Sequence, residues 1–375
     1  MDANKFFNEI HGNFGFGCMR LPMNEKAVDT EQFKLMADAF INAVFNYFDT
    51  AHGYINGLSE LAIKECVSKR YDRSRFLLTD KLTGSYFDKE EDIRPFFVSQ
   101  LEACGVEYFD FYLMHAQNAE NYKKFKECRA YETAAELKRE GRIKHFGLSF
   151  HDKAEVLDMI LTEHPEVDCV QIQLNYIDWE DPTVDSRGVY AVCEKHDKPV
   201  IVMEPVKGGQ LVNLPDEARA VLDGLGSGSN ASYAIRYAAG KKNVFMVLSG
   251  MSDIAQMEDN LSFMRDFKPL DDRELEAVSC VVDILHSLKM IPCTACRYCV
   301  EQNKCPRDIN IPGLFGLLNN QRIYKNFKGK MFYKWRTEDH GKASDCIRCG
   351  RCEKVCPQHI EIRRMLMTVS EEFED

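Results

Sequence analysis

Four polar residues stand where short apolar runs of the chain end. Asp49, Lys81 and His115 each close or directly follow such a run, and Tyr54 comes five residues after the first of them. The carboxyl ends of neighbouring parallel strands meet at one edge of a sheet. If the three runs are such strands, a carboxylate, a phenol, an ammonium and an imidazole converge at one place.

Reduction of a carbonyl by hydride needs the kinds of group that these residues carry. A phenol with a pKa of about 10 is a poor proton donor at neutral pH. A neighbouring ammonium favours the phenolate, so Lys81 is expected to lower the pKa of Tyr54. Asp49 would keep Lys81 charged and aimed, and His115 would orient the carbonyl oxygen. Each residue alone is an ordinary strand-end side chain, but the four in this order indicate a catalytic tetrad.

Cysteine spacing indicates a second kind of chemistry. The chain has 15 cysteines, and eight of them form two tight groups after residue 290. The second group has the spacing C-x2-C-x2-C-x3-C-P, which is typical of bacterial ferredoxins that bind a [4Fe-4S] cluster. The first group begins in the same way but has five residues before its fourth cysteine. The groups are Cys293, Cys296, Cys299 and Cys305, then Cys346, Cys349, Cys352 and Cys356.

In ferredoxins with two clusters, the fourth cysteine of each run binds the other cluster. The first three cysteines of the first group are therefore predicted to share a [4Fe-4S] cluster with Cys356. The first three of the second group would share another with Cys305. Structural zinc at two four-cysteine sites is the alternative, but zinc does not account for three cysteines at this spacing with Cys-Pro at the fourth.

The elements that must position the tetrad alternate between strand and helix. Near-continuous apolar runs predict strands buried on both faces, and amphipathic stretches between them predict helices. Alternation of this kind over about 250 residues is typical of a (β/α)8 TIM barrel, an α/β fold. A doubly wound open sheet is the alternative, but Gly15-Phe16-Gly17 lacks the third glycine of a dinucleotide fingerprint. The predicted strands are Phe14–Cys18, Tyr47–Ala51, Phe76–Lys81, Phe109–His115, His145–Phe150, Cys169–Asn175, Pro199–Glu204 and Val244–Ser249. The predicted helices are Thr30–Asn42, Leu58–Lys69, Lys89–Cys104, Ala119–Glu140, Lys153–Glu163, Val184–Lys195, Ala231–Ala239 and Ile254–Arg265.

Changes of pattern along the chain predict three parts. Residues 1–268 form the barrel, residues 269–290 a linking helix, and residues 291–375 a small helical ferredoxin-type domain, called the tail below. The long connection Val206–Asn230, rich in Gly, Pro and Ser, is predicted to be a lid over a ligand rather than an ordinary surface loop. The apolar face of the linking helix would be Leu275, Val278, Val282 and Leu285.

Composition excludes several classes of protein. A net charge of −11 argues against general nucleic-acid binding. No apolar run approaches the ~20 residues of a membrane helix, and Met1–Asn13 lacks a signal-peptide core. We therefore expect a cytoplasmic protein without membrane partners. The spacer between the cysteine groups is locally basic, either as a solvated face or as a surface that docks an acidic electron carrier. Its cations are Lys325, Lys328, Lys330, Lys334, Arg336 and Lys342.

The tetrad and its surroundings resemble the aldo-keto reductase family over residues 14 to about 265. The residues that carry the resemblance are Phe48-Asp49-Thr50-Ala51 and Tyr54, Lys81, His115, Gly147-Leu148-Ser149, Gln171 and Ser249–Asn260. With the tail and Glu204–Gly209, the chain is most similar to the ferredoxin-fused branch of that family. The resemblance implies an oxidoreductase acting on a small carbonyl or alcohol with NADPH or NADH. It makes Tyr54 the acid, Lys81 its modulator, Asp49 the partner of Lys81, and His115 the orienting residue.

The resemblance also implies where the nicotinamide cofactor binds. Ser149 and Gln171 would hold the carboxamide, and Gly250 to Asn260 would wrap the adenosine end. Four positions depart from the family pattern: Phe150 replaces an asparagine, Met203 a stacking aromatic residue, and Gly250 and Gln256 the basic residues that grip a 2′-phosphate. Discrimination against NADH is therefore expected to be weak. Arg20 or Lys207 could replace the missing basic contact to the 2′-phosphate.

Three functions are compatible with these motifs. The first is a carbonyl reductase that uses the tetrad, with two [4Fe-4S] clusters for electron transfer or structure. The second is a ferredoxin-linked redox enzyme with a flavin or another mediator at the barrel mouth, because hydride carriers move two electrons and clusters one. The third is a redox sensor or scaffold with an inactive barrel, which the intact tetrad disfavours.

Overall fold

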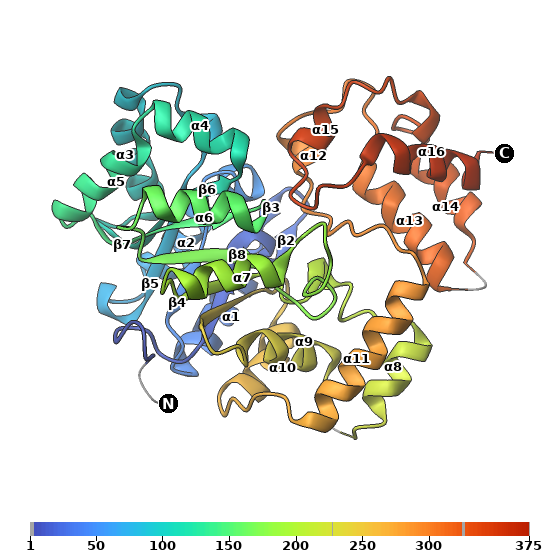
Figure 1. Cartoon of the computed structure of the whole chain (residues 1–375), viewed down its shortest axis with the longest axis horizontal. Coiled ribbons are helices and arrows are strands. Elements are labelled where there is room, and N and C mark those ends of the chain that lie inside the picture. The colour runs from blue at the N-terminus through green and yellow to red at the C-terminus, as the bar shows by residue number, and fades with distance from the viewer. Residues whose placement is uncertain (1–3, 227, 325–326, 375) are drawn as a thin grey trace. The chain divides into compact units, whose positions relative to one another are not determined.

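The computed structural model describes residues 4–226, 228–324 and 327–374. The chain forms two compact units (Figure 1). The first is Met1–Pro205 with Ala231–Leu270, and the second is Val206–Asn230 with Asp271–Asp375. The predicted boundaries at residues 268 and 290 remain a prediction. Within the described ranges, no helix is both long and apolar enough to cross a membrane.

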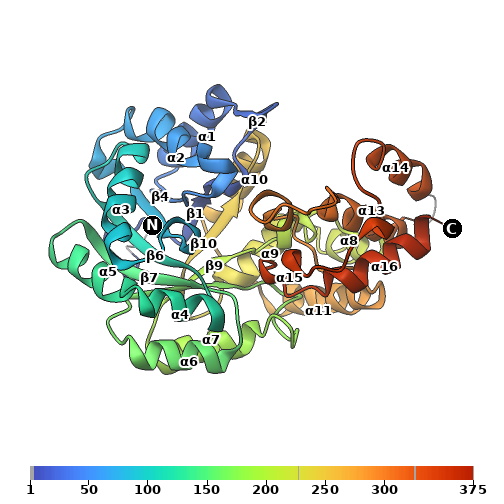
Figure 2. The same cartoon turned by 90° about the horizontal axis from the view of Figure 1, so that it is seen from above.

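Eight parallel strands close into a barrel in the first unit, which confirms the predicted (β/α)8 fold (Figure 2). Around the ring the order is β1-β10-β9-β8-β7-β6-β5-β4. Each barrel strand therefore lies beside its neighbours in the sequence, and the pairing of β1 with β10 closes the ring. The runs of Val, Ile, Leu and Phe that predicted these strands are buried on both faces because helices cover the outside. The strands are β1 Phe14–Gly17, β4 Tyr47–Asp49, β5 Leu77–Leu82, β6 Phe109–Gln117, β7 Ile143–Phe150, β8 Cys169–Gln173, β9 Val200–Met203 and β10 Val244–Gly250.

Helices of the first unit surround the barrel, and several begin at a capping side chain. The carboxylate of Asp29 accepts a hydrogen bond from the Gln32 amide at the start of α1, and Asn118 and Asp253 act in the same way on α4 and α10. These caps satisfy amide donors that the first helical turn leaves unpaired. The helices are α1 Thr30–Asn42, α2 Leu58–Ile63, α3 Glu90–Cys104, α4 Ala119–Glu127, α5 Ala130–Arg139, α6 Ala154–Glu163, α7 Ser186–Lys195, α9 Asn230–Ala239 and α10 Ile254–Met264.

One end of the barrel interior is filled by apolar side chains. Phe7 and Ile10, which precede β1, pack there against Phe111, Phe245 and other inward-facing strand residues. This plug lies at the end where the strands begin. The opposite end, where the strands finish, holds the polar side chains of the predicted tetrad.

Three local features of the first unit were not predicted. The predicted helix Ala119–Glu140 is two helices, because Arg129 adopts a left-handed φ of 52° between α4 and α5. A short hairpin, β2 Met23–Asn24 with β3 Ala27–Val28, follows β1. The helical path after α2 continues through Lys64–Ser68 as a π-turn.

The second unit is helical and has a core of its own. Ile311, Leu314, Phe315, Leu366 and Val369 are among its buried residues. The predicted apolar face of the linking helix was wrong in part, because Leu275 is 41% exposed and Ala277 and Val281 are buried. The helices are α8 Asp216–Asp223, α11 Asp272–Ser287, α12 Tyr298–Glu301, α13 Ile311–Ile323, α14 Gly329–Arg336, α15 Arg351–Lys354 and α16 Ile362–Phe373.

The long connection Val206–Asn230 belongs to this second unit. It contains a helix, α8, that packs against α11 (Figure 1). The Gln210 side chain donates a 2.6 Å hydrogen bond to the carbonyl of Cys293, one of the predicted cluster ligands. Gly208 has a φ of +63°, and a Cβ there would lie 2.3 Å from the Thr294 carbonyl oxygen, so a side chain would not fit. The segment therefore braces the first cysteine group, and its predicted role as a lid remains a prediction.

Candidate active site and cluster ligands

The structure brings the four predicted catalytic side chains together at the carboxyl ends of three adjacent strands. Asp49 is the last residue of β4, Lys81 lies in β5, and His115 lies in β6. Tyr54 opens the turn Tyr54–Gly57 that follows β4. Strand register places Asp49 beside Thr79, two residues before Lys81. The side chains of all four are largely or fully buried.

Lys81 is the centre of the group. Its Nζ donates hydrogen bonds to Asp49 Oδ1 at 2.7 Å, to the Thr50 carbonyl at 2.7 Å and to the Tyr54 hydroxyl oxygen at 3.2 Å. An ammonium has three protons, so these acceptors fix its direction fully. The Tyr54 oxygen accepts from Lys81, which leaves its own proton to donate elsewhere.

The expected lowering of the Tyr54 pKa is wrong for this structure. Burial raises the pKa of Tyr54 well above its ordinary value, and the charges of Asp49 and Asp80 raise it further. Lys81 does not overcome these effects because its charge is matched by the carboxylate of Asp49. Burial likewise raises the pKa of Asp49, and the charge of Lys81 opposes that rise. Tyr54 is therefore a neutral phenol throughout the physiological pH range.

His115 is a neutral imidazole. Burial lowers its pKa well below the ordinary value, and the charge of Lys81 lowers it further. Its Nδ1 lies 2.6 Å from the Thr83 hydroxyl. With Thr83 as the donor, the ring carries its proton on Nε2. The rings of Tyr54 and His115 meet edge to face with centroids 6.1 Å apart.

Ser149 and Gln171 lie side by side next to the tetrad. They are paired in register on β7 and β8. The Ser149 hydroxyl oxygen accepts from the Ala116 amide at 2.8 Å, and Gln171 Nε2 donates to Asp49 Oδ2 at 3.2 Å. The hydroxyl donor and the amide carbonyl acceptor that these side chains offer are complementary to the two polar ends of a carboxamide.

The other predicted cofactor residues are distributed over β9, β10 and α10. Met203 ends β9 beside Gln173 and is half-buried. Asn260 donates to Ser249 Oγ at 2.8 Å, which ties α10 to the end of β10. Gln256 is exposed and donates to the capping carboxylate of Asp253. Gly250, Gln256 and Asn260 lie along one continuous stretch of β10 and α10, whereas Met203 stands apart from it at the end of β9.

Of the two residues expected to compensate for missing cations, Arg20 lies beside the predicted adenosine-binding stretch. Its side-chain carbons would be 3.4 Å from a Cβ on Gly250, and its carbonyl accepts from Ser252 Oγ at 2.8 Å. Lys207 belongs to the second unit and is buried.

The tail brings cysteines from both groups together. Burial raises the pKa of the Cys299 thiol, and the thiols of Cys296, Cys293, Cys356 and Cys352 raise it further. Burial raises the pKa of Cys352 to about 11, with smaller contributions that include Cys346 and Cys305. Each of these central cysteines therefore has the fourth cysteine of the other group among its neighbours.

The positions of the tail sulfurs bear on the alternative of single zinc ions. A tetrahedral zinc with bonds of about 2.3 Å would hold its sulfurs roughly 3.8 Å apart. Among the described residues, the sulfurs of no three tail cysteines lie within 4.8 Å of one another. The described tail cysteines therefore do not form the compact group of sulfurs that a single zinc ion needs.

Two contributors to the tetrad were missed by sequence reasoning. The Thr50 carbonyl is a backbone acceptor, which no residue pattern reveals. Thr83, which fixes the His115 ring, stands two residues after Lys81 on the same strand end, so this spacing could have drawn attention to it.

A closed eight-stranded barrel with a phenol, an ammonium and an imidazole at its carboxyl end agrees with the class of protein that the family comparison identifies. The aldo/keto reductase family matches residues 13–283, and a 4Fe-4S dicluster domain matches residues 292–361. The chain therefore belongs to the aldo/keto reductase family and carries a 4Fe-4S dicluster domain after its barrel.

Individual relatives agree with this assignment. An NADH-specific methylglyoxal reductase of Escherichia coli (strain K12) is 26% identical over 201 residues, 47% of this chain and 58% of that protein. The chain thus spans less than two thirds of that relative's length. An aldo-keto reductase from Klebsiella pneumoniae in complex with NADPH superposes with a TM-score of 0.59 at 17% identity, over 72% of this chain and 90% of that one. A Bacillus halodurans aldo-keto reductase in its holo form gives 0.59 at 22% identity, over 72% and 91%. At sequence identities this low, the two structures support the fold alone.

Proposed function

We propose that the barrel reduces a small carbonyl compound with a nicotinamide cofactor, using Tyr54 as the proton donor. The observation that carries this proposal is the fully buried ammonium of Lys81, which is bonded to both Asp49 and the Tyr54 oxygen. A lysine is costly to bury, and one aimed at a phenol has a direct use when that phenol becomes anionic. Anaerobic enzyme should oxidise NADH or NADPH with formation of one alcohol per cofactor when given methylglyoxal or related aldehydes.

The four residues divide the work of proton transfer. Tyr54 gives its proton to the carbonyl oxygen as the carbon receives hydride, and the product is the alcohol. The hydrogen bond from Lys81 stabilises the phenolate left behind, which then regains a proton from solvent. Asp49 holds Lys81 in place. The neutral His115 donates from Nε2 to the same carbonyl oxygen and so fixes its position.

The nicotinamide would supply the hydride when it is bound. Ser149 and Gln171 hold its carboxamide, and Gln171 also contacts Asp49, which links cofactor position to the tetrad. Met203 forms part of the surface beside the ring, and Gly250, Gln256 and Asn260 belong to the stretch that wraps the adenosine end.

NADH and NADPH should bind with affinities within about tenfold of each other. No basic side chain stands at Gly250 or Gln256, and a charge-assisted contact to the 2′-phosphate is worth about 1.5–3 kcal/mol. Titration of anaerobic enzyme with both cofactors measures the ratio. NADPH binding a hundredfold more tightly would contradict this expectation. Arg20→Ala then shows whether Arg20 is responsible, because its NADH affinity should stay unchanged while NADPH binding weakens.

The tail is proposed to bind two [4Fe-4S] clusters and to exchange single electrons with an acidic carrier. Helix α14 presents exposed Met331, Phe332 and Trp335. The exposed cations around them are Lys328, Lys330, Lys334 and Arg336, whereas Lys325 lies outside the described residues. An exposed aromatic patch within a basic rim suits an acidic protein surface. We also propose a cytoplasmic location, because a reducing compartment keeps the many thiols of the chain from forming disulfides.

This docking surface favours the ferredoxin-linked function as the second candidate. Reduction of the clusters by an acidic ferredoxin or flavodoxin should slow steeply as salt rises, because exposed charges are screened. At low salt, Lys334→Glu should reduce the rate of cluster reduction below that of the unmodified protein. Lys124→Glu, which changes a lysine on the barrel surface, should leave that rate unchanged. Equal rates in Lys334→Glu and the unmodified protein would contradict docking at α14.

A further inference from the structure

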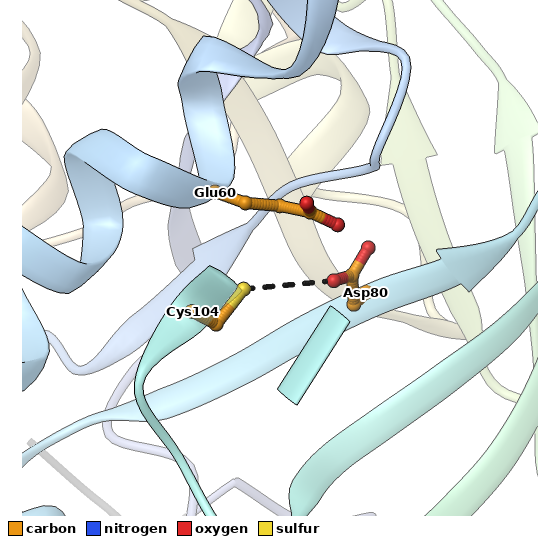
Figure 3. Close-up of side chains that lie close together, drawn as sticks. All are labelled: Glu60, Asp80 and Cys104. Carbon is orange, nitrogen blue, oxygen red and sulfur yellow. Dashed lines mark hydrogen bonds between the residues drawn. The ribbon is translucent and has the colours of Figure 1, made fainter. Parts of the chain in front are cut away.

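A pair of buried carboxyl groups lies outside the tetrad. Figure 3 shows Glu60 from α2 and Asp80 from β5 pointing toward one another, with the Cys104 thiol from the end of α3 beside them. All three residues are at most 1% exposed, and their ligand-type atoms lie within 4.8 Å of one another. Cys104 Sγ donates to Asp80 Oδ2 at 3.6 Å.

The two carboxyl groups cannot both be ionised in such a place. Burial raises the pKa of Asp80 well above its ordinary value, and the neighbouring Glu60 raises it further. Burial raises the pKa of Glu60 to about 7. Two carboxylates in contact behave as one unit that releases its protons in separate steps. At neutral pH the pair therefore retains at least one proton.

Hydrogen bonds connect this pair to the peptide of Lys81. Asp80 Oδ1 accepts from the Lys81 amide at 2.7 Å. Gln100 Nε2 donates to the Lys81 carbonyl at 3.0 Å and toward Glu60 Oε1 at 3.4 Å, while the Tyr112 hydroxyl donates to Gln100 Oε1 at 2.6 Å. Successive side chains of a strand point to opposite faces, so the pair lies behind the strand from which the Lys81 side chain reaches the tetrad.

His52 connects the pair to solvent. Its Nδ1 lies 2.8 Å from Glu60 Oε2, and its side chain is 30% exposed. Burial lowers the pKa of His52, so the ring is neutral near pH 7. A neutral imidazole can take a proton on one nitrogen and release one from the other.

We propose that Glu60 and Asp80 share a proton as a pair of positioning residues behind Lys81, and that releasing it through His52 weakens Tyr54 as an acid. This inference rests on the proposed function of the tetrad. A second negative charge behind Lys81 opposes the stabilisation that its ammonium gives to the developing phenolate. The reaction should therefore slow as the pair ionises. The other titratable groups that face the pair are His52 and Tyr54 after β4, Lys81 in β5, Tyr86 after β5, Cys104 in α3 and Tyr112 in β6.

The test compares pH profiles of the single-turnover reduction rate between pH 6 and pH 9. The unmodified holoenzyme should lose about tenfold in rate as pH rises through neutrality. Asp80→Asn and Glu60→Gln keep the shape of each side chain but remove its charge. Both substitutions should therefore flatten the alkaline limb of the profile, which is the decrease in rate above neutral pH, and leave KM within about twofold. Glu65→Gln changes an exposed carboxylate on the following turn and should keep the limb. Profiles of both pair variants that superimpose on the unmodified enzyme would overturn the proposal.

Infrared spectroscopy gives a readout that needs neither turnover nor stable variants. The unmodified protein at pH 6 should show the C=O stretch of a buried protonated carboxyl group, and this band should lose intensity as pH rises through neutrality. Absence of that band at pH 6 would overturn the shared proton. If the band titrates but no carbonyl is reduced, the shared proton stands and the proposed function of the tetrad fails. If carbonyl reduction runs with no alkaline limb, the coupling to Tyr54 is wrong and the tetrad stands.

Discussion

Tyr54→Phe should reduce carbonyl reduction by about 10³-fold, since general acid catalysis contributes roughly 10²–10⁴-fold. The phenylalanine ring retains the packing of Tyr54 but has no proton to give and no oxygen for Lys81 to stabilise. Burial keeps the Tyr54 pKa high, so Tyr54 remains protonated and a large loss should be seen at every pH at which the enzyme is folded. Steady-state turnover on the best aldehyde substrate measures it.

A second buried tyrosine provides the matched control. Tyr176 is 4% exposed, and its hydroxyl has no hydrogen-bond partner in the part of the chain that the structure describes. Tyr176→Phe should therefore leave turnover within about threefold. Tyr54→Phe with near-normal turnover, at unchanged cluster content and thermal stability, would rule out the tetrad as the proton donor.

Cys305→Ser should remove one [4Fe-4S] cluster and leave the other, although Cys305 stands in the first cysteine group. Its predicted cluster is the one on Cys346, Cys349 and Cys352, because the fourth cysteine of each run binds the other cluster. Iron should fall from about eight to about four atoms per chain. Cys280→Ser, which changes an exposed thiol on α11, should leave iron content unchanged.

The identity of the lost cluster can be established in a variant that has only one. Cys346→Ala with Cys349→Ala should leave the cluster of the first group with its electron paramagnetic resonance signal after reduction. Adding Cys305→Ser to this variant should leave the signal in place, and adding Cys356→Ser should abolish it. The opposite pair of results would show that each run binds its own cluster.

The barrel was predictable because a strand buried on both faces has a near-continuous apolar sequence. The convergence of Asp49, Lys81 and His115 followed from this, since the carboxyl ends of neighbouring strands meet. How deeply each side chain is buried in the folded chain could not be predicted from the sequence in the same way. It governs the pKa of Tyr54, where desolvation outweighs the lysine that the sequence places nearby.

Contacts between distant segments account for the remaining differences. The buried face of α11 depends on where α8 packs, and α8 lies in a connection that reads as a loop. Glu60 lies in α2 and Asp80 lies in β5, 20 residues further along the chain. Their side chains come together only in the folded protein. The one available signal was a carboxylate, Asp80, inside an otherwise apolar strand next to Lys81.

In the proposed reaction, hydride passes from nicotinamide to a carbonyl carbon at the tetrad. The direct measurement is a single turnover of anaerobic holoenzyme with nicotinamide deuterated at C4, using methylglyoxal and a panel of aldehydes, while the cluster absorbance near ~400 nm is followed. We predict one deuterium on the alcohol carbon per cofactor oxidised, and formation of this product about 10³-fold more slowly in Tyr54→Phe. Oxidation of the cofactor with bleaching of the clusters and no deuterium in any product would contradict the account and favour a ferredoxin-linked enzyme.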